Sequence, residues 1–314
     1  MRLPWGRAPR AALSSPVTVL VAVVTGLVVA FVAASTVFHV SASGSAAVRY
    51  VSEKRCPDDT GLSIERGGGS YFAPTVESPL GIPDEVIRET AARHGLDLVR
   101  QTRYASTLPL SVDGHGVDGR LVARDGAQQH VRPTAGGATT EGVWVPAELA
   151  EKFGVEVGDE LVVGTKAGPM ALPVTAVYPT ITEPVDGFWC SQRSEVIKLI
   201  AIPEGQIRPP VVLVAPETMD RLVAGGLVVQ AERIQITASR LPTDRESAVR
   251  HAAAVAAVRA ELEPRLHGRD AVEQATINDR AAYPAASGDR ALQAVGGSLV
   301  PLTGIALLVG LAAV

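Results

Sequence analysis

A long uncharged segment near the N-terminus sets the first constraint on this 314-residue chain. No Asp, Glu, Lys or Arg lies between Arg10 and Arg49, and residues 17–40 are mostly Val, Ala, Leu and Phe. As an α-helix, residues 17–40 would extend about 36 Å, enough to cross a hydrocarbon layer of about 30 Å with some tilt. The segment therefore predicts a transmembrane helix over residues 16–40, with membrane lipid around it.

A cleaved secretory signal is the alternative, because small residues that suit a signal peptidase follow at 41–46. The uncharged core is longer than the roughly 7–15 residues typical of a signal, so we expect an uncleaved anchor. Arg2, Arg7 and Arg10 precede it with no acidic residue among them. The positive-inside bias therefore places residues 1–15 in the cytoplasm and the residues after the helix outside.

A second uncharged segment runs from Ala291 to Val314 and is most apolar from Leu299 onward. It predicts the start of a second transmembrane helix over residues 295–314, which returns the chain towards the cytoplasm. No Lys or Arg marks the far interface within these residues. We therefore expect a multi-pass protein of the cell membrane, of which this chain is a truncated piece; a tail-anchored protein is the alternative.

Residues 41–290 form the predicted extracytoplasmic region, which is larger than a usual single domain. Clusters of Gly, Pro, Ala and Ser, typical of loops, break it near residues 67–70, 134–138 and 202–210. The predicted class is an α+β region of two lobes, flanked by transmembrane α-helices. The expected boundaries are an α+β lobe at 41–139 and 204–290, and an inserted mostly-β lobe at 140–203.

Both lobes contain recognisable helix and strand patterns. In the α+β lobe, Pro83 and two acidic residues open a helix that Gly95 ends. In the inserted lobe, a short helix ends at Gly154, and Gly158-Asp159 predicts a tight turn before a strand. The other expected elements are strands at 96–100, 143–145, 171–178, 211–214 and 233–237, and helices that begin at Pro216 and Asp244.

One sequence segment in the inserted lobe resembles a known family. Val143–Leu161 reads VWVPAELAEKFGVEVGDEL, which combines a strand, a short helix ending in glycine and a Val-Gly-Asp turn. Pro173–Tyr178 reads PVTAVY, a returning Val-rich strand. The phrase resembles the extracytoplasmic core of MacB/FtsX-type ABC transporter permeases. Its position in a large loop between two membrane helices is similar too, so the resemblance covers nearly the whole chain.

The resemblance implies a permease subunit of an ABC transporter, whose outside domain transmits ATP-driven motion or engages a substrate or partner. It also implies a dimer with itself or a related permease, and a separate cytoplasmic ATP-binding subunit. The sequence has no GxxxxGK[ST] phosphate loop, since Gly164-Thr165-Lys166 lacks the upstream glycine and the following hydroxyl residue. The family has four membrane helices, whereas this chain ends within the second.

Two other classes of protein remain open: a membrane-anchored sensor or adaptor domain, and an anchored hydrolase. No nucleophile elbow or paired-carboxylate motif supports an enzyme, so we expect no catalytic residue and no cofactor. A formal net charge of −4 with interspersed signs provides no basic surface for nucleic acid.

No metal site is expected either. Residues 113–119 read DGHGVDG, with two Asp and three Gly, but lack the spacing and the terminal Glu of a calcium loop, which favours a simple turn. The histidines lack metal-ligand spacing, which favours structural or solvent-exposed roles. They are His39, His94, His115, His130, His251 and His267.

Cys56 and Cys190 are the two cysteines, and both lie in the predicted outside region, where a disulfide can form. A bond between them would tie the inserted lobe to the segment after the first membrane helix. Two unrelated thiols remain the alternative.

Ala22, Gly26, Ala30 and Ala34 recur every four residues in the first membrane helix. Small residues at this spacing let another helix approach closely, so they form a candidate packing face. A stripe that faces lipid is the alternative.

Overall fold

The chain divides into two compact units. The first comprises Met1–Glu53, Pro242–Val249 and Tyr283–Val314, and the second comprises Lys54–Leu241 and Arg250–Ala282. The computed structural model describes residues 16–66, 82–112, 114–137, 141–182, 187–197, 200–202, 205–207, 209–227, 229, 231–266, 276–295 and 297.

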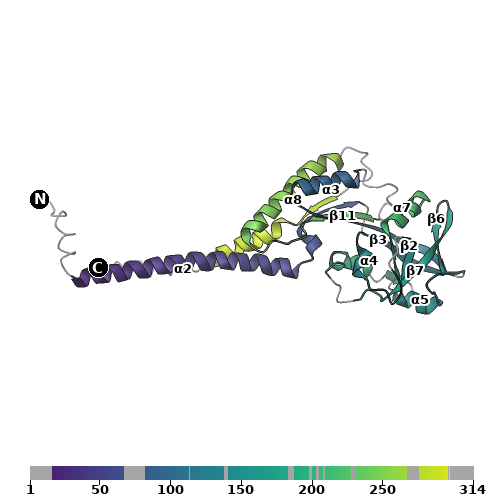
Figure 1. The fold of residues 1–314 in the computed structure, drawn as a ribbon, viewed down its shortest axis with the longest axis horizontal. Helices are drawn as coiled ribbons and strands as arrows, with labels where there is room; N and C mark the ends of the chain where they lie inside the picture. The colour runs from purple at the N-terminus through teal and green to yellow at the C-terminus, as the bar shows by residue number, and fades with distance from the viewer. Residues whose placement is uncertain are drawn as a thin grey trace. The chain divides into compact units, whose positions relative to one another are not determined.

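The first unit contains the long helix α2, Pro16–Lys54, drawn in purple in Figure 1. Its 39 residues extend about 58 Å. Within the described residues, it is the one helix that is long and apolar enough to cross a membrane, and its apolar part is exposed. The helix continues beyond residue 40, the predicted end of the membrane span, because no proline lies between Pro16 and Pro57 to break it. The end of the span itself stays a prediction.

A second helix of the same unit, residues 282–295, packs against α2. Figure 1 shows this helix in yellow beside α2. The two backbones approach closely where Gly44 faces Gly288. The predicted second membrane helix, 295–314, lies almost entirely outside the described residues.

The second unit is built on a mixed sheet. Within the described residues the sheet has ten strands, in the order β12-β1-β11-β2-β3-β10-β5-β7-β4, and β6 pairs with both β2 and β7. Two neighbouring pairs, β3–β10 and β5–β7, are parallel, and the other pairs are antiparallel. The strands are β1 Leu62–Arg66, β2 Leu98–Val112, β3 His115–Arg124, β4 Ala135–Gly136, β5 Val143–Pro146, β6 Glu160–Thr165, β7 Gly168–Tyr178, β10 Val211–Val214, β11 Ala231–Thr237 and β12 Thr276–Asp279, while β8 Ile200–Ile202 and β9 Gly205–Ile207 form a separate pair.

Helices and short helical turns connect these strands (Figure 1). The longest is α8, Arg245–Leu266, whose first turn belongs to the first unit. The others are η1 Pro57–Thr60, α3 Asp84–Arg93, α4 Ala127–His130, α5 Ala147–Phe153, η2 Cys190–Gln192, α6 Arg193–Val196 and α7 Pro216–Ala224.

Most predicted elements of the second unit are confirmed. Helix α3 ends before Gly95, and α5 ends at Gly154; both glycines have the positive φ of a helix terminus. Gly158 also has positive φ, as the predicted turn before β6 requires. Strand β2 is much longer than predicted. Val112 pairs directly with His115, which makes residues 114–119 of the predicted turn part of the β2–β3 hairpin.

The centre of the sheet is buried on both faces. Along β10, Val212 and Val214 join one hydrophobic cluster, while Val211 and Leu213 join another. Successive side chains of a strand point to opposite faces, so the two clusters lie on opposite sides. Helices α5 and α7 contribute to the first cluster. A third cluster joins β1 and β11 to α3 and α8.

The structure therefore has a mixed α/β architecture with one large sheet. Strands β5, β6 and β7, which the sequence assigns to an inserted lobe, pair with β10 and β2 in that sheet. The division into two lobes stays a prediction.

Gly61 lets the segment between η1 and β1 lie against β11. A Cβ at this position would overlap the carbonyl oxygen of Ile236, which is a backbone atom and cannot rotate away. Gly61 has a negative φ that other residues also adopt, so the requirement here is space.

We expect Gly61→Ala to lower the free energy of unfolding by about 1–3 kcal/mol, the usual range for overpacking. Gly116→Ala is the matched control, because a Cβ at Gly116 meets no atom within 4 Å. Its effect should stay within about 0.5 kcal/mol. Denaturant unfolding of the detergent-solubilised chain measures both variants, and equal losses would contradict the close approach.

Candidate functional site

The two cysteines lie together at the start of the second unit. Cys56 directly precedes η1, and Cys190 begins η2. Their Cα atoms are 5.7 Å apart and their sulfur atoms are in disulfide contact. This separation falls within the roughly 4.4–6.8 Å typical of disulfides. The geometry supports the bond, which stays a prediction.

Two residues after Cys56, the Asp58 carboxylate forms a buried ion pair with Arg124 at the end of β3. Arg124 Nη2 lies 2.5 Å from Asp58 Oδ2, and the two side chains are 0% and 1% exposed. Arg100 Nη1 donates to Asp58 Oδ1 at 2.7 Å, and Ser191 Oγ donates to Oδ2 at 3.1 Å. We call these four residues the Asp58 clamp.

The Arg124 guanidinium also binds other buried acceptors. Nη1 donates to Thr102 Oγ1 at 2.7 Å and to Gln235 Oε1 at 3.0 Å, and Nη2 donates to the Phe188 carbonyl at 3.0 Å. Burial lowers the pKa of Arg124, and Asp58 opposes that shift. Because the ordinary pKa of arginine is so high, the group stays charged. A charge at this depth requires such partners.

Aromatic rings cover the Asp58 clamp. The Arg124 guanidinium lies 4.5 Å from the centre of the Phe188 ring and 6.0 Å from that of Trp189, and Arg100 lies 5.0 Å from Phe188. His130 stacks on Phe188 at 4.0 Å. These cation–π contacts stabilise the buried Arg124 and the partly buried Arg100.

A second layer of hydrogen bonds extends from Gln192, which is fully buried. Its Nε2 donates to Gln235 Oε1 at 3.0 Å, and its Oε1 accepts from Arg233 Nη1 at 3.1 Å and from the Tyr104 hydroxyl. Burial raises the pKa of Tyr104. The segment that contains η2 is thus bonded to β2 and β11 as well as to Asp58.

The Asp58 clamp attaches the segment that follows α2 to the sheet. Asp58 receives bonds from β2, β3 and η2 together. The sequence analysis missed it, because Asp58 and Arg124 are 66 positions apart and look like scattered surface charge.

Besides His130, which stacks on Phe188, two histidines have contacts in the second unit. His251 Nε2 lies 2.9 Å from the Thr60 carbonyl, and His94 Nε2 lies 2.6 Å from Glu261 Oε1. His267 falls outside the described residues. Across the described part of the chain, no group of three His, Cys, Asp or Glu side chains could hold a metal ion.

The small residues predicted as a packing face lie on the exposed surface of α2. Ala22, Gly26, Ala30 and Ala34 are all exposed, and a Cβ built at Gly26 meets no described atom within 4 Å. The closest helix contact instead occurs farther along α2, at Gly44 and Val48.

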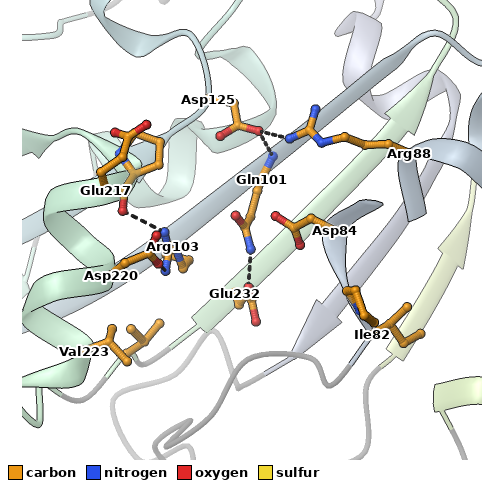
Figure 2. Close-up of a pocket in the computed structure, with 13 residues that line it drawn as sticks. Ile82, Asp84, Arg88, Gln101, Arg103, Asp125, Glu217, Asp220, Val223 and Glu232 are labelled. Carbon is orange, nitrogen blue, oxygen red and sulfur yellow. Dashed lines mark hydrogen bonds and ion pairs between the residues drawn. The ribbon is translucent and has the colours of Figure 1, made fainter. Parts of the chain in front are cut away.

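The second unit also contains a charged pocket of about 460 Å³, shown in Figure 2. Helices α3 and α7 and strands β2 and β11 provide most of its wall. Its lining residues are Ile82, Pro83, Asp84, Arg88, Gln101, Arg103, Asp125, Pro216, Glu217, Asp220, Val223, Val229 and Glu232.

Ion pairs occupy much of the pocket wall. Arg88 Nη2 lies 3.1 Å from Asp125 Oδ2, and Arg103 Nη1 lies 2.5 Å from Asp220 Oδ1. Gln101 links two carboxylates: its backbone NH donates to Asp125 and its side-chain amide donates to Glu232 (Figure 2). The pocket therefore combines a hydrogen-bonded, charged wall with apolar side chains such as Ile82 and Val223.

Negative charge prevails in this pocket, where five carboxylates face two guanidinium groups. Asp84, at the first position of α3, is exposed as a residue, but partial burial of its carboxylate raises its pKa. Asp125 and Asp220 raise the pKa further, whereas Arg88 and Arg103 oppose them. The pocket thus favours a cationic group over an anionic one. Its carboxylates come from four separate segments, so no sequence motif signals it.

Arg124→Met should lower the free energy of unfolding by about 3–5 kcal/mol, because it removes the main partner of a buried carboxylate. The matched control is Arg88→Met, since the Arg88–Asp125 pair is 51% and 26% exposed. Exposed pairs contribute about 0–1 kcal/mol. Denaturant unfolding measures both, and a small loss for Arg124→Met would contradict the Asp58 clamp.

Asp84→Asn and Asp97→Asn should change stability in opposite directions at pH 7. Because the pKa of Asp84 is raised in the folded protein, the ionised carboxylate lowers the free energy of unfolding at any pH above that pKa. This loss of stability disappears below pH 3.8, the ordinary pKa of aspartate. The pKa of Asp97 is lowered by hydrogen bonds from the Ser239 hydroxyl and backbone NH. The ionised Asp97 carboxylate therefore stabilises the fold above pH 3.8, and this stabilisation is lost as the pH falls through the lowered pKa.

Urea unfolding at pH 7 should accordingly give a higher midpoint for Asp84→Asn and a lower midpoint for Asp97→Asn. Both differences should shrink at acidic pH. Shifts of the same sign at pH 7 would contradict the assigned environments.

No family model and no curated protein matches the chain. Among solved structures, it is similar to the periplasmic region of MacB from Actinobacillus actinomycetemcomitans, with 11% identity over 72% of this chain and 91% of that chain and a TM-score of 0.42. It is also similar to a domain of a putative permease from Porphyromonas gingivalis, with 12% identity, 72% and 92% coverage and a TM-score of 0.38.

A third similar structure is the extracellular domain of the noncanonic ABC-type transporter YknZ from Gram-positive bacteria. It has 13% identity over 68% of this chain and 99% of that chain, with a TM-score of 0.38. At these TM-scores the superpositions transfer no residue role to this chain.

Proposed function

We propose that this chain belongs to a membrane-spanning permease subunit of an ABC transporter, with its large domain outside the cytoplasm. The observation that carries the proposal is α2, a single helix that includes the apolar span and continues to Lys54. Cys56 and Asp58 follow at once, and Asp58 is held by the sheet. We expect a displacement along α2 to reach the second unit through these few residues.

The sequence segment that resembles the permease core supports the same proposal. Val143–Leu161 folds as strand β5, helix α5, the Gly158 turn and the first part of β6, and Pro173–Tyr178 is the end of β7. These are the elements that the resemblance implies, in the implied order. We extend the proposal to the two-lobe division, with residues 140–203 as the inserted lobe.

The proposed topology has residues 1–15 in the cytoplasm, residues 41–290 outside and a second membrane helix over 295–314. The arginines before α2 support this orientation. The proposed partners are a separate cytoplasmic ATP-binding subunit, membrane lipid, and a second copy or a related permease. In this arrangement, ATP-driven motion enters through the membrane helices, and the outside domain transmits it or engages a substrate or partner.

Co-purification tests this function. The full-length protein, extracted from its native membrane in mild detergent, should bring down an ATP-binding subunit. ATP hydrolysis should require that subunit, because the chain contains no phosphate-binding loop.

The Arg124→Met variant, solubilised in parallel, tests the role of the Asp58 clamp. This variant should still bring down the ATPase. The substitution lies in the second unit, whereas the proposed ATPase contact is made from the cytoplasmic side. Repeated recovery of the protein without any ATPase would favour an anchored sensor or adaptor. Hydrolysis of ATP or a peptide by the purified chain alone would favour an anchored enzyme.

A further inference from the structure

A groove of about 590 Å³ lies beside β4, at one edge of the large sheet. Its walls come from β4, β7, helix α5 and the turn that follows α5. Apart from two glutamates, the lining consists of Ala, Gly and Val side chains. We call it the β4 groove, and its lining residues are Ala135, Gly136, Ala150, Glu151, Gly154, Val155, Glu156, Val157 and Val177.

One apolar side chain continues this groove into solvent. Among the described residues of the second unit, Val157 is the only large apolar side chain that is exposed, with 44% of its surface accessible. Hydrogen bonds fix the turn that carries it. The backbone NH of Gly158 donates to the Val174 carbonyl at 2.8 Å, and the backbone NH of Glu156 donates to Asp159 Oδ2 at 2.7 Å. A partner that covers Val157 therefore orders little additional chain.

The charge around the β4 groove has one sign. Glu151 and Glu156 are exposed, and neither carboxylate has a hydrogen bond or an ion pair within the described part of the chain. Between residues 141 and 165 the sequence has six acidic residues and one basic residue, Lys152. The Lys152 ammonium lies 5.3 Å from the centre of the Phe153 ring. The charged rim therefore complements a basic partner.

The edge position of β4 adds main-chain chemistry. In the described chain β4 pairs with β7 alone, so its other side can accept an additional strand. A Cβ built at Gly154 meets no atom within 4 Å, which leaves open space beside the end of α5. Because β4 has only two residues, strand pairing can add few hydrogen bonds. Side chains that enter the groove must provide the specificity.

We propose that the β4 groove binds an extended segment of a partner protein, in which an apolar residue is flanked by Lys or Arg. The apolar residue covers Val157 and the small residues of the groove. The basic side chains pair with Glu151 and Glu156, and the backbone of the segment runs along the open side of β4.

A second copy of this chain fits the β4 groove less well. In a two-fold symmetric contact the same surface patch meets itself, which would place carboxylates opposite carboxylates. Like charges oppose such a contact.

This inference deepens the proposed function, because it names the chemistry of a partner for the outside domain. It rests on that function only for the location of the partner outside the cytoplasm. Its test requires no ATPase. A failure to recover an ATPase would leave peptide binding unaffected, and a failure of peptide binding would leave the recovery of an ATPase unaffected.

Selection from a displayed library of random linear peptides, with the full chain in mild detergent as the target, tests the chemistry. A second selection uses the double variant Glu151→Gln, Glu156→Gln. Peptides enriched on the parent chain should share an apolar residue with Lys or Arg beside it, and the double variant should not enrich them. An acidic or uncharged consensus, or no consensus, would overturn the proposal.

Fluorescence anisotropy with the most enriched peptide then measures the site. The double variant Glu151→Gln, Glu156→Gln should bind it about two- to thirtyfold more weakly, the range for two exposed ion pairs. Added sodium chloride should weaken binding to the parent chain and affect the double variant less. Val157→Ser should weaken binding about three- to tenfold, because half-exposed apolar surface is no longer buried.

Two matched variants serve as controls. Glu85→Gln with Glu89→Gln removes an exposed acidic pair from α3, and Val249→Ser removes an equally exposed valine, 45% accessible, from α8. Both should bind the peptide as the parent chain does. Equal losses in the groove variants and the controls would overturn the proposal. A dimer of the detergent-solubilised chain that Val157→Ser dissociates, measured by light scattering, would assign the groove to a second copy and overturn it as well.

Discussion

The ion pair between Asp58 and Arg124 is the constraint on which the second unit depends. A buried carboxylate and a buried guanidinium each need several partners, and these partners come from β2, β3, β11 and the segment around η2. The pair therefore determines where three distant parts of the chain must meet. Phe188 and Trp189 add cation–π contacts to the Arg124 guanidinium.

Helix α2 joins the apolar span and the segment that follows it in one continuous helix. Its last three turns contain Gly44 and Val48, against which the helix 282–295 packs. Arg245, in the first turn of α8, adds an ion pair to Asp289 of that helix, with Nε and Oδ1 2.7 Å apart. The first unit thus joins three segments of the chain through close packing and one exposed charge pair.

Local signals in the sequence were sufficient for individual elements but not for the contacts between them. Four consecutive apolar residues predicted β10 correctly, because a strand buried on both faces needs no alternation. Pro83 and Gly95 predicted the bounds of α3. The end of α2 was missed, because loss of hydrophobicity after Val40 ends a membrane span without ending a helix. The Asp58 clamp and the charged pocket depend on pairs of residues from distant segments, and a single sequence carries no signal for such pairs.

The position of β1 has a consequence for biogenesis. Leu62 pairs with Ile236 of β11 on one side and with Asp279 of β12 on the other. On the proposed topology, this strand leaves the translocation machinery among the first outer residues and must wait for nearly the entire region before either neighbour arrives. Pairings of such long sequence separation form slowly, and an unpaired strand edge is prone to aggregation. On that topology, we expect β1 to keep an unpaired edge, prone to aggregation, until β11 and β12 have been exported.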